Sequence, residues 1–549
     1  MSRNPRFLFL GLFLAFHLLV HAPSHAARTV LPLEDRQSRS ALFDWSPLVQ
    51  QIQQFLIEFD LLAGPANGRM TPETQQAIRA YQEQSDRPVT GGADEDLLRH
   101  METVGRAATL KKRLARARDQ QVEKARNALE GSAATRDLLQ SDKPLLAAVP
   151  QDGIDRCLRA PDIACLLESA IGAVSKIARE DYRDWALRDI VRALAAAGKL
   201  EEARQTIRQL SDLRLVLVSL RETAAALAEA GNAAEALALT ETIPDPWNRS
   251  RALLAVAIAE TENDAVVDTL IELLPKLEDR AGAIEIAAEL LSELAEKGHA
   301  SRADAVFDMT QTLLDGVKDE ARIALGTLAT GYAKAGRQKS ASAVMKRLGE
   351  SGRDTIAFAE YAAMLARQGD MSAAMAAANR LRTPRLFVLA MTKVAAALHE
   401  QDRTNAAADA LRKAEAATPD IERAFAADTA WAQIATVWSD LALPNQALER
   451  IGKIKSRTLS AQTLWGFAAK SQEPDSGMFD RAVAATDLIE STFDRAATFA
   501  RAATGLAKAG RLDQARQAFD YAVREAKAIR NGWWQARILS LLSTVLTKF

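Results

Sequence analysis

The chain has 549 residues, of which 48% are hydrophobic and 26% charged, so it can bury an apolar core large enough for several domains. Its formal net charge is only -1, which argues against nucleic acid as a partner because a polyanion is held mainly by positive charge. Aromatic residues make up 5% of the chain, a low share that is typical of helices packed through small residues.

The first 27 residues have the pattern of a cleavable signal peptide. Arg3 and Arg6 precede an apolar run from Phe7 to Val20, and the small residues of "APSHAA" follow, with cleavage expected after Ala26 or Ala27. The alternative is an uncleaved anchor helix, but a membrane span needs about 20 apolar residues. We therefore expect a periplasmic mature protein without a stable membrane span, beginning with a polar linker over residues 28–45.

Residues 46–102 are expected to form a small domain of three short helices. Ser46 and Pro47 are typical of a helix start, and apolar residues follow at helical spacing. The breaking segment "AGPANGRM" ends this helix, and Thr71 with Pro72 opens the next one. The segment "DRPVTGGADEDLL" then supplies a second break and the start of a short third helix.

The order of residues in this segment resembles the peptidoglycan-binding domain type 1. The matching residues are Val49, Ile52, Gln53, Gly68, Thr74, Ala77, Ile78, Tyr81, Gln82, Val89, Gly91, Leu97 and Leu98. The resemblance implies that peptidoglycan is the ligand and that it contacts Asn67, Gly68, Thr74, Tyr81 and Gln82.

Three residues depart from the family pattern, and all lie in one loop. Asn67 stands where the family has Asp, Met70 where it has an aromatic residue, and Thr71 where it has a second Gly. A purely structural role is the alternative for the candidate ligand residues. Gly68 would then supply a positive φ, Thr74 and Gln82 would brace the loop, and Tyr81 would belong to the core.

Residues 103–130 read as a helical connector, and residues 131–155 as a linker. The connector carries a basic cluster that either is solvated or touches an anionic wall polymer. The cluster consists of Lys111, Lys112, Arg113, Arg116 and Arg118.

The two cysteines, Cys157 and Cys165, lie just after the predicted linker. Pro161 should break the helix between them, which would let them form a disulfide in an oxidising compartment. Two buried thiols are the alternative.

Residues 156–549 contain a repeated pattern in which a glycine is followed five residues later by an alanine. Clear copies are Gly198/Ala203, Gly231/Ala236, Gly298/Ala303, Gly336/Ala341, Gly369/Ala374 and Gly510/Ala515, and weaker ones start at Asp402, Ala442 and Gly477. The mean spacing is about 35 residues, which resembles the tetratricopeptide repeat of two helices per unit, although HEAT-like hairpins are an alternative. The sequence thus predicts an all-α protein whose largest part is a tetratricopeptide-like α-solenoid of about ten helical hairpins.

Such an array should offer a groove to protein partners. Counting back from the first glycines places Trp185, Arg188, Arg192 and Arg221 on the first helices of two units. Tryptophan and arginine are frequent at interaction sites, and ordinary packing between helices is the alternative.

The residues give little support to catalysis. His100, His299 and His399 are isolated from one another in the sequence, so neither a metal site nor any other cofactor is expected. The stretch "ESTFDRAATF" at Glu490 resembles the first motif of lytic transglycosylases, but the G-L-M-Q motif that should follow is missing. The predicted function is a non-catalytic peptidoglycan-binding scaffold, and the alternatives are a wall-turnover enzyme and a protein-interaction scaffold that does not bind the wall.

Overall fold

The computed structural model describes residues 46–139, 148–260, 264–352, 355–470 and 477–549. The predicted signal peptide and the linker of residues 28–45 lie outside the described residues. Within these ranges the chain forms 26 α-helices, three short 3-10 helices and no strand, which confirms the all-α prediction. The chain divides into two compact units, residues 1–117 and residues 118–549, and no helix in the described ranges is both long and apolar enough to cross a bilayer.

Unit 1 contains helices α1 (Pro47–Glu58) and α2 (Pro72–Gln84) and the first part of α3 (Glu95–Gly131). The side chains of Ser46 and Thr71 accept the N–H groups of Val49 and Thr74 in the first turns of α1 and α2. A proline follows each of these caps, as the sequence predicts. The small core is formed by Ile52, Leu56, Ala77, Ile78, Tyr81, Leu97 and Met101.

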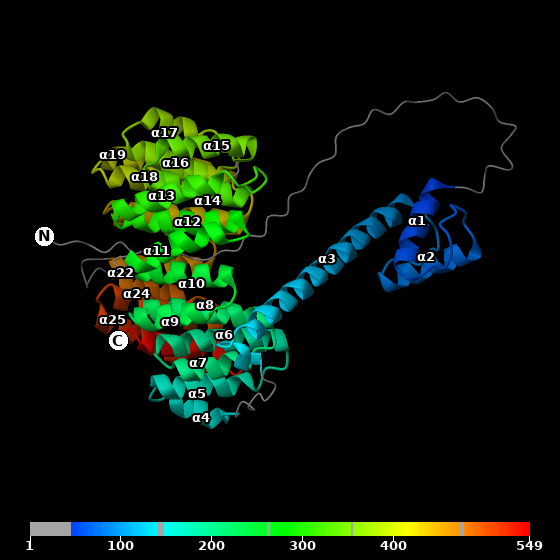
Figure 1. Cartoon of the computed structure of the whole chain (residues 1–549), viewed down its shortest axis with the longest axis horizontal. Helices are drawn as coiled ribbons and strands as arrows, with labels where there is room; N and C mark the ends of the chain where they lie inside the picture. The colour runs from blue at the N-terminus through cyan, green and yellow to red at the C-terminus, as the bar shows by residue number, and fades with distance from the viewer. Residues whose placement is uncertain (1–45, 140–147, 261–263, 353–354, 471–476) are drawn as a thin grey trace. The chain divides into compact units, whose positions relative to one another are not determined.

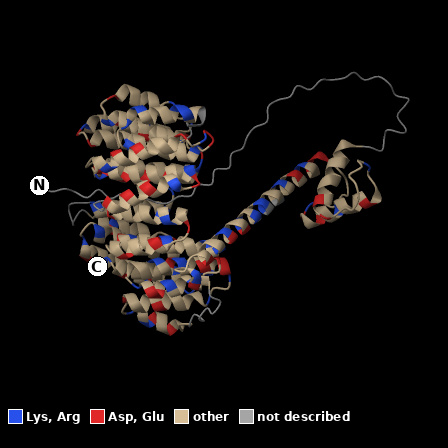
Figure 2. Ribbon diagram, in the orientation of Figure 1, with Lys and Arg blue, Asp and Glu red and all other residues tan. Residues whose placement is uncertain are grey.

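Helix α3 is one helix of 37 residues and not the short third helix plus separate connector that the sequence suggested. No proline interrupts it, and its one internal glycine, Gly105, lies against the ring of Phe55. A Cβ atom at Gly105 would come within 2.9 Å of Phe55 Cε1, so this glycine permits close packing of α1 on α3 and does not end the helix. Both basic and acidic residues lie along α3 (Figure 2), and the predicted basic cluster of Lys111, Lys112, Arg113, Arg116 and Arg118 falls in its middle part.

Unit 2 is built from ten consecutive helical hairpins (Figure 1). They are α6 (Glu180–Ala196) with α7 (Leu200–Ile207), α8 (Leu213–Glu229) with α9 (Ala233–Thr242), α10 (Pro246–Ala259) with α11 (Asp264–Leu273), α12 (Arg280–Glu296) with α13 (Ala300–Leu314), α14 (Arg322–Lys334) with α15 (Gln338–Gly352), α16 (Ala357–Arg367) with α17 (Met371–Ala378), α18 (Pro384–His399) with α19 (Thr404–Ala417), α20 (Ala424–Asp440) with α21 (Pro444–Ile451), α22 (Arg457–Lys470) with α23 (Met478–Asp487), and α24 (Thr492–Lys508) with α25 (Leu512–Ala526). Short 3-10 helices follow α11 (Leu274–Lys276) and α19 (Thr418–Asp420). Each first helix packs on the first helices of both neighbouring hairpins, whereas each second helix packs mainly on its own first helix, so the first helices form a continuous inner layer.

The glycine and alanine pattern marks the turns of these hairpins. Gly198 has a φ of 71°, and the weaker copies Asp402 and Ala442 each have a φ of 59°, so the left-handed turn is kept where glycine is absent. The alanine five residues later is buried where the second helix meets the first. The buried alanines are Ala203, Ala236, Ala303, Ala341, Ala374, Ala407, Ala447, Ala482 and Ala515.

The hairpin array closes on itself. Helix α26 (Gly532–Leu546) packs on α24 and also on α6, and α5 (Ile163–Val174) lies along α26 as its second helix. An eleventh hairpin is therefore assembled from the two ends of the repeat region. Glycine is needed at Gly532, because a Cβ atom there would lie 2.9 Å from the carbonyl oxygen of Ala173. Figure 1 shows the red C-terminal helices beside α6 and α7.

The segment before α5 is attached to the same region. Helix α4 (Gln151–Cys157) ends before Pro161, and Asp162 caps α5. A disulfide joins Cys157 to Cys165, whose Cα atoms are 5.8 Å apart. Part of the predicted linker forms a 3-10 helix (Arg136–Leu139). In it, Asp137 pairs with Arg204 of α7 and with Arg208, the residue that follows α7, at 2.5 Å each.

Candidate functional site

The loop between α1 and α2 is held by the side chain of Gln53. Its amide nitrogen donates to Asn67 Oδ1 at 3.2 Å, to the carbonyl oxygen of Arg69 at 2.9 Å and to Thr74 Oγ1 at 3.0 Å. Its carbonyl oxygen accepts the N–H of Gly68 at 2.8 Å, and Gly68 has a φ of 74°. One buried glutamine thus fixes most of the loop that the resemblance assigns to ligand binding.

Gln82 plays the same part in the loop between α2 and α3. Its carbonyl oxygen accepts the N–H groups of Thr90 and Gly91 at 2.9 Å each, and its amide nitrogen donates to Thr90 Oγ1 at 3.0 Å. Gly91 has a φ of 69°, and a Cβ atom there would lie 2.6 Å from Arg79 Nε. Gln82 therefore fixes this loop and is not free to contact a ligand.

Tyr81 belongs to the core of unit 1. Its ring stacks on Phe59 with the centroids 5.4 Å apart, and its hydroxyl lies 2.9 Å from Nδ1 of His100. Burial raises the pKa of the Tyr81 phenol, although the charge of Arg87 acts in the opposite direction.

The structure brings Asn67, Gly68 and Thr74 together around Gln53, but places Tyr81 in the core and Gln82 at the other loop, and it gives four of the five predicted ligand residues internal roles. Gly68, Thr74, Tyr81 and Gln82 are buried, and only Asn67 is exposed. The side-chain oxygen of Asn67 also accepts the N–H of Arg69 at 3.0 Å, which explains how asparagine can replace the family's aspartate in a purely structural role. Sequence reasoning noted Gln53 as a match but missed its bracing role. In the sequence, this role is indicated by a polar glutamine that follows Ile52 and lies on the buried side of the helix with Leu56.

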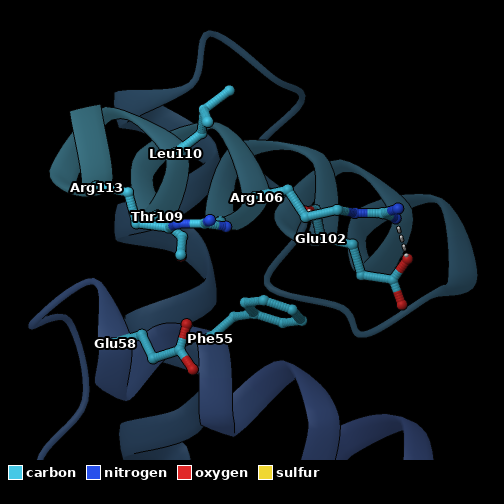
Figure 3. Close-up of a pocket in the computed structure, with 8 residues that line it drawn as sticks. Phe55, Glu58, Glu102, Arg106, Thr109, Leu110 and Arg113 are labelled. Atoms are coloured by element: carbon cyan, nitrogen blue, oxygen red, sulfur yellow. Dashed lines mark hydrogen bonds and ion pairs between the residues drawn. The ribbon is translucent and has the colours of Figure 1, made fainter. Parts of the chain in front are cut away.

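A groove of about 490 Å³ lies between α1 and α3 (Figure 3). Phe55 and Glu58 of α1 form one wall. The other wall consists of residues of α3, namely Glu102, Gly105, Arg106, Thr109, Leu110 and Arg113. The groove is open to solvent, and 47% of the surface of Leu110 is exposed.

The charges of this groove are only partly paired. Arg106 forms an ion pair with Glu102 at 3.1 Å, on the same helix. Glu58 and Arg113 form no ion pair with any described residue, and they come from opposite walls. The groove therefore offers the carboxylate of Glu58 and the guanidinium of Arg113 from opposite walls.

The four residues predicted for a partner groove lie on the inner layer of unit 2. Two of them tie neighbouring first helices together: Arg188 pairs with Glu222 at 3.1 Å, and Arg221 donates to Asn248 at 3.4 Å. Burial lowers the pKa of Arg221, against the attraction of Glu222. Trp185, with 50% of its surface exposed, and Arg192 remain open to solvent.

Trp185 is part of an aromatic cluster that sequence reasoning missed. We name it the seam cluster, and it consists of Tyr182, Trp185, Phe493, Trp533 and Trp534. Tyr182 stacks on Trp533 at 4.9 Å between centroids, and Phe493 contacts Trp534 at 4.2 Å. All five are at least partly exposed, and they come from α6, α24 and α26. No local pattern in the sequence could have brought them together, because the array must close first.

The motif at Glu490 has a structural explanation. The side chain of Ser491 caps α24 by accepting the N–H of Asp494 at 3.2 Å. The side chain of Glu490 is 89% exposed and pairs with Arg457 at 3.3 Å. Across the described parts of the chain, no group of three or more His, Cys, Asp or Glu residues is arranged to hold a metal ion.

Comparisons with known proteins identify only the N-terminal unit. The crystal structure of Ton1535 from Thermococcus onnurineus NA1 has 14% sequence identity to this chain and a TM-score of 0.23. The aligned region covers 59% of this chain and 99% of the Ton1535 chain. The pentatricopeptide repeat protein PPR10 from maize is 13% identical with a TM-score of 0.22, and covers 92% of each chain. A circular tandem repeat protein is 13% identical with a TM-score of 0.16, and covers 92% of this chain and 97% of its own. These scores are too low to support an argument.

Among curated proteins, no sequence matches the chain. Residues 46–101 do match a family model, and that model is the putative peptidoglycan binding domain.

Proposed function

We propose that the protein is a non-catalytic periplasmic scaffold that unit 1 holds at the peptidoglycan while unit 2 recruits protein partners. The observation that carries this proposal is the match of residues 46–101 to the putative peptidoglycan binding domain, in a segment that folds as a separate small core. A fold alone does not define a function, so this module supports the proposal and the repeats do not.

Two further features support a location outside the cytoplasm. Residues 1–27 carry the basic, apolar and small-residue pattern of a signal peptide. Cys157 and Cys165 are joined by a disulfide, a bond that persists in oxidising compartments such as the bacterial periplasm.

For the partner surface we propose the exposed side of the seam cluster together with Arg192. Trp185 is half exposed, and the ring of Tyr182 lies between Trp185 and Trp533. Tryptophan, tyrosine and arginine are the residue types enriched among strongly contributing interface residues. Arg188 and Arg221 would act indirectly, by holding the first helices in place.

Binding to purified sacculi tests the wall-binding part of the proposal. The mature chain should pellet with sacculi, and a variant lacking residues 28–105 should stay in the supernatant. Equal pelleting of both proteins, or of neither, would contradict the proposal. Release of soluble muropeptides during the incubation would support the wall-turnover enzyme instead.

A photo-crosslinking amino acid at position 185 tests the recruitment part. It should give a discrete crosslinked product in cells. The matched control is position 512, because Leu512 is also an exposed apolar residue but begins a second helix, α25. The same products at both positions, or none at position 185, would remove Trp185 from the partner surface.

A further inference from the structure

We propose that the groove between α1 and α3 binds the stem peptides of peptidoglycan as short zwitterionic ligands, with Arg113 facing a ligand carboxylate and Glu58 a ligand ammonium group. This inference rests on the proposed wall-binding function and names the part of the polymer that is recognised. It assigns no role to the sugar chain.

The shape of the groove is a property of this chain and not only of the matched module. Six of the eight residues that line it lie beyond residue 101, where the match to the family model ends. They are available because α3 continues past the module without a break. Gly105 brings α3 close enough to Phe55 to form the floor.

The charges of the groove suit a ligand with two separated charges of opposite sign. Glu58 and Arg113 remain unpaired with other described residues and belong to different helices (Figure 3). A stem peptide carries free carboxylates and a free amine. An N-acetylated sugar backbone carries no ammonium group, so it could not form an ion pair with Glu58. Arginine also matches carboxylates geometrically, through two parallel hydrogen bonds.

The uncharged residues fit the rest of a short peptide. The ring of Phe55 and the exposed side chain of Leu110 can cover alkyl groups such as an alanine methyl, and the hydroxyl of Thr109 can bond a peptide group. The loops that the family pattern favours are less suitable, because Gln53 and Gln82 already use their polar groups to hold them.

The test compares intact sacculi with sacculi from which an amidase has removed the stem peptides. The full mature chain should pellet with intact sacculi and lose most of this binding on the stripped ones. A free stem peptide should also release the protein from intact sacculi. Equal binding to intact and stripped sacculi would overturn the inference while leaving the proposed function in place, whereas no binding to intact sacculi would defeat the proposed function itself.

Matched substitutions locate the binding. Glu58→Gln and Arg113→Gln should each weaken binding to intact sacculi by about tenfold, the usual effect of losing one charge-assisted hydrogen bond. Glu83→Gln and Lys111→Gln make the same changes of charge at exposed positions of unit 1 outside the groove and should leave binding unchanged. Circular dichroism checks that all four variants fold. Equal losses in the groove variants and their controls would show general charge attraction and overturn the assignment.

Discussion

Nε of Arg537 lies 2.8 Å from Oδ2 of Asp189, a residue 348 positions earlier in the chain. This ion pair joins the last helix of the array, α26, to its first inner helix, α6. The guanidinium of Arg537 also lies over the ring of Trp533, 5.0 Å from its centroid. The ring of Trp533 in turn stacks on Tyr182 of α6, so the ends of the repeat region are joined by charge and by aromatic packing together.

We expect Arg537→Ala to lower the free energy of unfolding by about 1–2 kcal/mol, because it removes a partly buried ion pair and a cation–π contact. Urea denaturation followed by circular dichroism measures this change. The control is Arg516→Ala, which removes an exposed pair with Asp513 and should have almost no effect. Additive effects of Arg537→Ala and Asp189→Ala in a double-mutant cycle would mean that the pair is not coupled.

Replacement of both cysteines by serine should destabilise unit 2 by about 2–3 kcal/mol, the cost expected for opening a loop of this length. The bond joins α4 to α5, and α5 packs on α26, so loss of the bond should also destabilise α26. Hydrogen exchange should become faster in α26, and reduction of the wild-type protein should reproduce the effect. Unchanged exchange in α26, with faster exchange elsewhere, would contradict this link.

Gln53→Leu should lower the free energy of unfolding of unit 1 by about 2–4 kcal/mol. The hydrogen bonds of Gln53 to both sides of the loop are lost, and the N–H of Gly68 remains buried without a partner. Hydrogen exchange of residues 60–75 measures the loss of protection. Gln54→Leu is the matched control at an exposed position of the same helix, and its exchange should equal that of the wild type. Wild-type protection in Gln53→Leu would show that the loop does not depend on this side chain.

Stability at high pH should depend on Tyr332. Burial raises the pKa of its phenol to about 12, against the hydrogen bonds with Thr310 and Gln311. The neutral phenol is favoured in the folded state, so its contribution is complete below about pH 10, the ordinary pKa of tyrosine, and is lost as the pH rises towards 12. Between these pH values the wild type should lose about 2 kcal/mol more stability than Tyr332→Phe. Parallel pH profiles of the two proteins would contradict the expected role of Tyr332.

The repeats could be predicted from sequence because their signals are local and depend on particular residues. A left-handed turn favours glycine, and a close helix crossing requires a small residue such as Ala515. Ring closure gives no such signal. Tyr182 and Trp533 look like ordinary helix residues until the two ends of the array meet.

The candidate site shows a different limit of sequence reasoning. A family pattern retains residues that hold a loop as readily as residues that touch a ligand, so Gln82 and Thr74 could not be assigned from the pattern alone. The groove was missed because Glu58 and Arg113 are far apart in sequence, and the continuity of α3 brings both to the groove. Gly105 lies inside α3, where it permits close contact with Phe55.

Because the array is closed, none of its hairpins is a terminal repeat with a single neighbour. In an open solenoid the terminal repeats have only one neighbour and tend to unfold first. Here α26 has a neighbour on each side, and Thr547 and Lys548 line one cavity with Ile163, the first residue of α5. In a chain that begins at α5, a short peptide could therefore join Phe549 to Ile163, and the chain could be cut at another turn, such as that at Gly336. This circular permutant should assemble the same array, because every hairpin would keep both of its neighbours.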